Sequence, residues 1–318
     1  MQENIDYMML YRIAKYYYED HISQNDIAKK EHVSRPHVSR LLAKACDCGI
    51  VTIKVSLSDE LQTSETRHVL KEKLGLKDVI IAFVPNESRN IDQKISLNIA
   101  TVAAKAFPKL IKGCKNIGLG WGYTMYQTSL QISYNNECDK LTFVPLIGTS
   151  GEDNPYLQIN SIVDRFAEKH GANSYYTNIP VVREKYMELG KIEQQRYGRL
   201  KRYWDKLDMA VIGLGPPPME GKFLISEISA EYKQSIINSH TQGDILSQFF
   251  YEDGSTYNVN PQYRQACYDI SRLKEVKNVV CLAGGSSKVN GIIAAARNSF
   301  FNTLITDSST AKLILEKI

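Results

Sequence analysis

The chain of 318 residues has no long apolar run, since no stretch approaches the roughly 18 apolar residues that a membrane-spanning helix needs. Its N-terminus is acidic and rich in tyrosine, and so we expect no secretory signal peptide. Internal repeats and low-complexity tracts are missing as well. A hydrophobic content of 43% therefore predicts folded domains with cores and little disorder.

Cysteine is also scarce, with six residues in the chain. One pair is separated by a single residue, which is too close for the usual zinc spacing, and no second pair accompanies it. We therefore expect no metal site, no cofactor, and reduced, mostly buried cysteines in a protein of the cytosol. The six are Cys46, Cys48, Cys114, Cys138, Cys267 and Cys281.

A strong excess of one charge is missing too, because the net charge is only +4. Basic residues are nevertheless concentrated in one place. Between Lys29 and Lys44, five Lys or Arg stand against a single acid, Glu31. Such a local cluster is expected where the phosphate backbone of DNA would lie.

The same region, Ser23–Gly49, has the pattern of a helix-turn-helix. Ser23 is placed to N-cap a first helix, with Asp26 as the reciprocal acid, and Ser34 is placed to cap a second. Pro36 falls in the first turn of that second helix, where its missing N–H costs nothing. The pattern is typical of proteins that insert the second helix into a DNA major groove.

The predicted second helix has one apolar and one polar face. Val38, Leu41, Leu42 and Ala45 fall at helical spacing and would pack against the domain. The polar face would meet base edges and phosphates. The residues that we expect to contact DNA are Ser34, Arg35, Pro36, His37, Ser39, Arg40 and Lys44. The alternative is an ordinary helical hairpin whose basic face is solvated.

The rest of the N-terminal segment favours a winged helix-turn-helix domain over residues 1–57. Gly49 is placed to end the recognition helix, and Ile50–Leu57 then alternates like a strand. A further helix is predicted over Tyr7–Tyr18. Its expected packing residues are Met8, Ile13, Tyr16 and Tyr17.

Residues 58–77 are expected to connect two domains, because Glu60–Leu74 has the pattern of a polar helix that Gly75 closes. Over residues 78–318, short β-branched runs alternate with helical segments. This pattern predicts an α/β domain with a mostly parallel sheet and right-handed crossovers. The strands are expected at Val79–Val84, Ile117–Leu119, Leu141–Leu146, Met209–Leu214, Val279–Ala283 and Leu304–Thr306.

Glycine-rich turns follow four of these predicted strands. Their backbone N–H groups can approach an anion, and the carboxyl ends of parallel strands share one edge of a sheet. We therefore predict a site for a small phosphorylated ligand, with Lys288 as fixed positive charge and Thr124, Thr149 and Ser150 as hydroxyl contacts. The alternative is that the glycines serve only tight turns. The four turns are Gly118–Gly122, Gly148–Gly151, Gly213–Gly215 and Gly284–Gly285.

Six segments, taken together and in their order, resemble the SorC family of bacterial transcriptional regulators, and the resemblance covers nearly the whole chain. It implies an N-terminal DNA-binding domain and a C-terminal effector domain similar to sugar-phosphate isomerases and CoA transferases. It also implies a phosphorylated sugar as inducer, operator double-stranded DNA as partner, and a homodimer or homotetramer. The segments are SQNDIAKKEHVSRPHVSRLLAKA, GLGWGYTMYQ, PLIGTSGE, VIGLG, GDILSQFFYEDG and LAGGSSKVNGIIAAARNSFFNTLITDSSTA.

The resemblance assigns Asp244 to sugar hydroxyls and Lys288 to the position after the Gly-Gly pair. A carboxylate that accepts from two vicinal hydroxyls also gives sugar selectivity, although Asp244 can equally cap the turn before Ile245. Ile147 stands where some loops of this type carry a lysine that forms a Schiff base, so we expect reversible binding. The expected effector site is Gly120, Gly122, Tyr123, Thr124, Gly148, Thr149, Ser150, Gly151, Glu152, Gly213, Gly215, Asp244, Gly284, Gly285 and Lys288.

These patterns predict a transcriptional regulator of a carbohydrate or nucleoside catabolic operon. We expect a repressor, and an activator is the alternative that the sequence leaves open. A sugar-phosphate isomerase-like enzyme is the alternative, because Asp244, Glu152 and Lys288 can in principle carry acid–base chemistry. Against an enzyme, the glycine turns contain no His, and an isomerase has no use for a DNA-binding domain. A nucleotide-binding redox sensor would need a G-x-G-x-x-G turn, and the turn after Ile117–Leu119 lacks its third glycine.

The segment Arg183–Lys206 carries eight Lys or Arg against four acids. The ordinary interpretation is a solvated helix face. The alternatives are a subunit contact or a flank that touches operator DNA.

Overall fold

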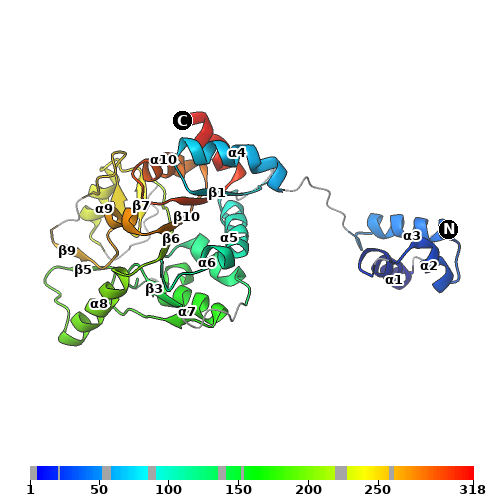
Figure 1. Cartoon of the computed structure of the whole chain (residues 1–318), viewed down its shortest axis with the longest axis horizontal. Helices are drawn as coiled ribbons and strands as arrows, with labels where there is room; N and C mark the ends of the chain where they lie inside the picture. Colours follow the sequence, from blue (N-terminus) through cyan, green and yellow to red (C-terminus); the bar gives the residue numbers. More distant parts are fainter. Residues whose placement is uncertain are drawn as a thin grey trace. The chain divides into compact units, whose positions relative to one another are not determined.

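A computed structural model of the chain describes residues 6–20, 22–51, 59–84, 91–134, 141–151, 154–218, 228–257 and 261–318. The chain divides into two units, Met1–Ser58 and Asp59–Ile318. No helix within the described ranges combines the length and the apolar character needed to cross a bilayer. Figure 1 shows the helices and strands of both units.

The smaller unit contains three helices whose starts are fixed by side-chain caps. The Ser23 hydroxyl accepts from the backbone N–H of Asp26 at 3.2 Å, and that of Ser34 accepts from His37 at 3.3 Å. The predicted helix starts are therefore confirmed, with Pro36 in the first turn of the third helix. The helices are α1 (Tyr7–Tyr18), α2 (Gln24–Lys30) and α3 (Arg35–Asp47).

The three helices close around a small apolar core. The expected packing role of Met8 is wrong, because 71% of this side chain is exposed, and Leu10 is buried instead. The Arg12 guanidinium donates two parallel hydrogen bonds to the Glu31 carboxylate, at 2.9 and 2.8 Å. They connect α1 to the end of α2. The buried core residues are Leu10, Ile13, Ala14, Ile27, Ala28, Val38, Leu42 and Ala45.

The end of α3 differs in part from the predicted wing. Gly49 has a φ of +74°, the left-handed conformation that a helix C-terminus needs and glycine adopts without strain. The backbone N–H groups of Ile50 and Val51 both donate to the Ala45 carbonyl, at 2.9 and 3.1 Å, so these two residues form a bend. Positions 52–57 of the predicted strand lie outside the described residues.

The larger unit is built on a seven-stranded sheet in the order β1-β11-β10-β6-β2-β3-β4. Every neighbouring pair is parallel, and each of the six predicted strands is present within a residue or two of its expected bounds. The strands are β1 (Asp78–Ala82), β2 (Asn116–Leu119), β3 (Thr142–Pro145), β4 (Asn173–Ser174), β6 (Met209–Gly213), β10 (Asn278–Leu282) and β11 (Thr303–Asp307).

Two groups of mutually packed helices flank this sheet, one formed by α5, α6 and α7 and the other by α4, α10 and α11. Two antiparallel strand pairs, β5 with β9 and β7 with β8, lie outside it. The helices of the larger unit are α4 (Asp59–Lys73), α5 (Ile91–Leu110), α6 (Tyr123–Gln131), α7 (Ile159–His170), α8 (Lys191–Trp204), α9 (Ala230–Ile237), α10 (Val289–Arg297) and α11 (Ser308–Lys317). The short pairs are β5 (Val182–Glu184), β9 (Tyr263–Gln265), β7 (Gly243–Ile245) and β8 (Gln248–Phe250).

Helix α4 occupies the predicted connector, but it packs against β1 and α11 and is part of the larger unit. Leu70 is fully buried there, and the Arg67 guanidinium pairs with the Asp78 carboxylate at 2.6 Å. Gly75 closes the helix with a φ of +64°. The division between the units therefore precedes the helix.

The cysteines only partly match the expectation. Cys281 is buried, but Cys48 is exposed and the other described cysteines are partly exposed. Cys138 lies outside the described residues. Burial raises the pKa of the Cys267 and Cys281 thiols to about 12, which keeps both protonated and unreactive.

Candidate effector pocket and DNA-binding helix

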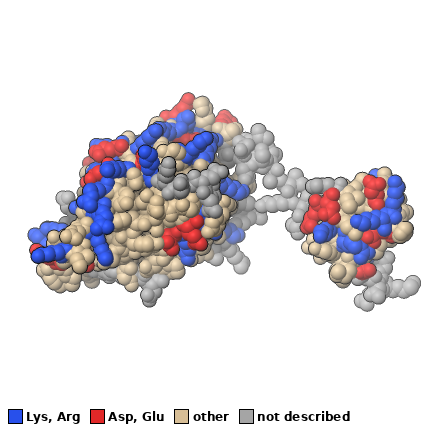
Figure 2. Space-filling view, turned by 60° about the horizontal axis from the view of Figure 1, so that its bottom comes forward, with Lys and Arg blue, Asp and Glu red and all other residues tan. Residues whose placement is uncertain are grey.

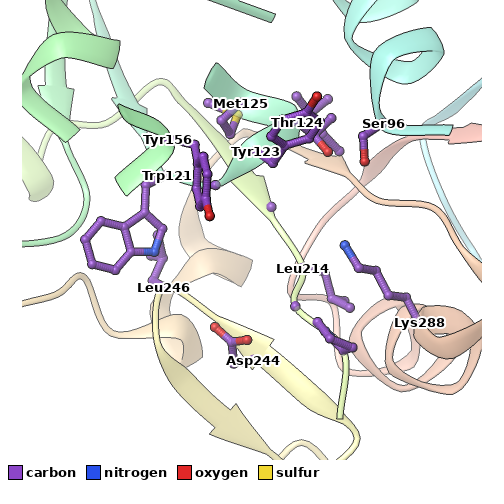
Figure 3. A pocket seen from close by; sticks show the side chains of 15 residues that line it. Ser96, Trp121, Tyr123, Thr124, Met125, Tyr156, Leu214, Asp244, Leu246 and Lys288 are labelled. Carbon is purple, nitrogen blue, oxygen red and sulfur yellow. The ribbon is translucent and has the colours of Figure 1, made fainter. Parts of the chain in front are cut away.

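A cavity of about 220 Å³ opens where β2, β6 and β10 end. This is the edge at which ligands bind in parallel α/β sheets. Figure 3 shows its side chains, with Asp244 and Lys288 reaching in from different elements and an aromatic group opposite them. The lining residues are Ser96, Trp121, Gly122, Tyr123, Thr124, Met125, Tyr156, Gly213, Leu214, Gly215, Pro216, Asp244, Leu246, Leu282 and Lys288.

The turn after β2 shapes one wall of the pocket. Gly122 has a φ of +118° and precedes α6, so a side chain at this position would be strained. Its N–H donates to the Tyr156 carbonyl at 2.9 Å, and the Gly120 N–H donates to Val211 at 2.8 Å. These two amides are thus engaged within the protein, and Thr124 at the start of α6 offers its hydroxyl to the cavity.

The turn after β6 holds Asp244 in place. The Gly215 N–H donates to the Asp244 carbonyl at 2.9 Å, which joins the end of β6 to β7. A Cβ atom at Gly215 would overlap the Asp244 carboxylate. Glycine is therefore required here by close approach.

Asp244 is also oriented by the tight turn between β7 and β8. The Ser247 N–H donates to its Oδ2 at 3.2 Å. Leu246 and Ser247 both have left-handed φ angles, of 53° and 60°, which non-glycine residues adopt only when the surroundings hold them. Burial raises the pKa of the Asp244 carboxyl to about 6, while the charge of Lys288 acts in the opposite direction.

Lys288 supplies the positive charge of the pocket. It ends a short 3-10 turn, Ser286–Lys288, that leads into α10. Burial lowers the pKa of its ammonium group, and the nearby Asp244 carboxylate counteracts this. Its Nζ points into the cavity, where it makes no hydrogen bond or ion pair with any described residue (Figure 3).

The Gly284–Gly285 pair positions Lys288 and does not itself line the cavity. The Gly285 N–H donates to the Thr310 hydroxyl at 2.7 Å, and that hydroxyl in turn donates to the Asp307 carboxylate. A Cβ at Gly284 would overlap Asp307 and the Ile99 side chain. The two glycines therefore allow the loop to pack closely on α5 and α11.

The second expected phosphate loop, Gly148–Gly151, is not among the residues that line this cavity. Its backbone is engaged elsewhere, because the Gly148 N–H donates to Ala266 at 2.7 Å and the Thr149 N–H to Ile179 at 2.8 Å. A Cβ at Gly148 would overlap the backbone of that neighbouring segment. Glu152 lies outside the described residues.

Several pocket residues were not predicted from the sequence. Tyr156 comes from a short 3-10 helix and packs edge-on against Tyr123, with ring centroids 6.0 Å apart. Ser96 comes from α5 and Leu246 from the β7–β8 turn. Trp121 and Leu214 carried a local signal, because each stands between two glycines of a predicted turn.

The outer face of α3 presents the expected DNA-contacting residues. Ser34, Arg35, Pro36, Ser39 and Arg40 are exposed, and His37 and Lys44 are partly exposed. Opposite this face the helix buries Val38, Leu42 and Ala45. The predicted two-faced helix is thus present, with Leu41 only partly buried.

A helix-turn-helix unit and an α/β unit with a ligand-sized pocket together define a ligand-responsive DNA-binding regulator. The family described as "Putative sugar-binding domain" matches residues 59–316. The chain belongs to the SorC family of transcriptional regulators.

Relatives of this chain match it over nearly its whole length. The sorbitol operon regulator of Klebsiella pneumoniae is 25% identical over 99% of this chain and 100% of its own. The deoxyribonucleoside regulator of Bacillus subtilis (strain 168) is 26% identical over 96% of both chains. The crystal structure of the full-length Klebsiella pneumoniae regulator SorC matches 98% of this chain and 99% of the SorC chain, at 24% sequence identity. Its TM-score of 0.78 shows that the two chains share a fold. Because these relatives are regulators, the chain is a transcriptional regulator and not an isomerase.

Proposed function

We propose that this regulator is controlled by reversible binding of a phosphorylated sugar in the pocket between Asp244 and Lys288. The observation that carries the proposal is the Lys288 ammonium group, which faces the cavity without a partner among the described residues. A cation without a partner in a partly desolvated site favours an anionic ligand, because hydrogen bonds from the ammonium group to the anion replace those that burial takes from water.

The remaining pocket chemistry suits the other end of such a ligand. The Asp244 carboxylate accepts hydrogen bonds from sugar hydroxyls, and Thr124 and Ser96 add hydroxyl contacts. The aromatic and aliphatic side chains opposite them cover the carbon skeleton. Ile147, at the position where some loops of this type carry a Schiff-base lysine, is fully buried and apolar, which is in keeping with the reversible binding that we propose.

The DNA side of the function rests on α3. We propose that its exposed face reads operator double-stranded DNA, and that the effector releases or tightens this contact in a homodimer or homotetramer. The names of the relatives, a sorbitol operon regulator and a deoxyribonucleoside regulator, support control of a carbohydrate or nucleoside catabolic operon. We propose that the protein acts there as a repressor.

Calorimetric titration with sugar phosphates and with their unphosphorylated parents tests the ligand. A charge-assisted hydrogen bond contributes about 1.5–3 kcal/mol, so Lys288→Ala is expected to weaken binding by roughly 10- to 100-fold. Lys109→Ala, at an exposed lysine of α5, is the matched control and is expected to bind as the unaltered protein does. Equal affinity for phosphates and parents would show that the pocket is not a phosphate site.

A further inference from the structure

A second group of cations lies on the strand pair β5–β9. Arg183 and Arg264 are direct cross-strand partners, and so their side chains project from the same face. Lys185 lies two residues beyond Arg183 and belongs to that face as well. Like charges directly opposite one another destabilise a strand pair, and this arrangement therefore calls for a compensating anion.

These three cations line a groove of about 340 Å³ together with Glu188, Leu189 and Gln194. The Arg183 guanidinium donates to the Met187 carbonyl at 2.6 Å. Among the described residues, none of the three cations forms an ion pair with a carboxylate. Against these three cations the groove has one carboxylate, that of Glu188, so its lining keeps a net positive charge.

Helix α8 extends this charge beyond the groove. Two acids lie on and directly after this helix: Glu193 accepts from the Gly190 N–H at 2.8 Å, and Asp205 pairs with Arg272 at 3.0 Å. Figure 2 shows Lys and Arg gathered at the end of the larger unit where α8 lies. The exposed cations on and directly after α8 are Lys191, Arg196, Arg199, Lys201, Arg202 and Lys206.

We propose that the groove and α8 form a basic surface that binds the phosphate backbone of duplex DNA without sequence preference. The cations extend along a helix of about 21 Å, which suits a polyanion better than a compact small anion. Duplex DNA offers a phosphate charge every 1.7 Å or so of its axis, and it is the polyanion that this regulator engages under the proposed function, on which the inference rests. The basic surface supplies a second contact to DNA beside that of α3.

The test is a salt titration of binding to a random-sequence duplex, followed by fluorescence anisotropy with the full-length chain. Each phosphate contact that is lost lowers the slope of log K against log salt by about 0.9. Arg199→Gln/Arg202→Gln is therefore expected to lower the slope by about 1.8. Lys105→Gln/Lys109→Gln, at exposed lysines of α5, is the matched control and is expected to leave the slope unchanged.

Arg183→Gln/Arg264→Gln is expected to lower the slope similarly and to keep or raise Tm, because it relieves the cross-strand repulsion. An unchanged slope in both basic-surface variants, or an equal loss in the control, would overturn the inference. A change in the light-scattering mass with an unaltered slope would overturn it too, and would assign the surface to a second copy of the chain. Lys44→Ala, measured in parallel, separates the outcomes: if it alone impairs binding to the random duplex, the proposed function stands and this inference fails.

Discussion

At the residue scale, the pocket contains two opposite charges, those of Asp244 and Lys288, and burial disfavours the charged form of each. Burial raises the pKa of Asp244 and lowers that of Lys288, and each charge partly counteracts the shift of the other. The Asp244 and Lys288 side chains do not form an ion pair with each other. Two such destabilised charges favour a ligand that neutralises Lys288 and donates hydrogen bonds to Asp244.

The raised pKa of Asp244 leads to a pH dependence of sugar binding. With a pKa of about 6 the carboxylate is ionised at pH 7.5, and it becomes mostly neutral as the pH falls to 5. If only the ionised form accepts the sugar hydroxyls, affinity is expected to fall about tenfold over this range. Titration calorimetry of the unaltered protein against Asp244→Asn isolates the effect, since the titration of the phosphate is common to both. A ratio of the two affinities that does not change with pH would show that sugar binding does not require the ionised form of Asp244.

His170 gives a separate pH effect, on stability. It is fully buried among Phe107, Phe143 and Phe166, its Nδ1 bonds to the Phe166 carbonyl at 2.7 Å, and burial lowers its pKa. Below pH 6.5 the unfolded chain therefore binds a proton that the folded chain resists, and stability is lost as the pH falls.

His170→Phe is accordingly expected to flatten the decline of unfolding free energy between pH 7 and pH 5, by at most about 1.4 kcal/mol per pH unit. Urea unfolding at several pH values measures this. His240→Asn serves as the control and is expected to keep the original slope, because His240 is exposed and its side chain forms no ion pair with any described residue. An unchanged slope in His170→Phe would mean that folding does not shift the pKa of His170.

The proposed DNA contact of α3 is also tested by single substitutions. Arg40 is exposed on the outer face of α3, and Lys44 lies one turn further along. Arg40→Ala is expected to lose discrimination between operator and random DNA, by roughly 1–3 kcal/mol. Lys44→Ala is expected to weaken binding to both and to lower the salt slope by about 1. Equal losses on both DNAs for Arg40→Ala would contradict its assignment to a base contact.

At the scale of elements, six of the seven strands of the parallel sheet were predictable, whereas β4, the two short strand pairs and the contacts between loops were not. The six strands were recognisable because buried parallel strands are short β-branched runs, and α2 and α3 because Ser23 and Ser34 cap them. Gly148–Gly151 resembles the other glycine turns in sequence, yet its backbone pairs with residues 179–181 and 266. Such partners are distant in the sequence, and local patterns carry no information about them.

The join between β6 and β7 is one of these distant contacts, and it has a testable consequence. A side chain at Gly215 would displace the Asp244 carboxylate, so Gly215→Ala is expected to lose sugar selectivity and some stability. Gly198→Ala is the control, because its Cβ would meet nothing within 4 Å and helix α8 would gain up to about 1 kcal/mol. Calorimetric titration and thermal melting of both variants check this. Normal selectivity in Gly215→Ala would show that Asp244 adapts without cost.

At the scale of the whole molecule, the proposed function gives the described part of the chain one DNA-reading helix, α3, and one effector pocket. A single α3 reads only a few base pairs, and specific operators are commonly read by two such helices in successive major grooves about 34 Å apart. The smaller unit has a core of only a few side chains, whereas the larger unit has a continuous one. We therefore expect the larger unit to supply the subunit contact.

Light scattering is expected to show a dimer or tetramer at micromolar concentration, both with and without DNA. A duplex in which two half-sites are moved from 10 to 15 base pairs apart is expected to bind more weakly, because the second helix then faces the wrong side of the DNA. Lengthening the spacing to about 20 base pairs restores the helical phase and is expected to recover part of the affinity. A monomer under all conditions, or an affinity that ignores half-site spacing, would mean that each chain reads DNA alone and that the effector acts within a single subunit.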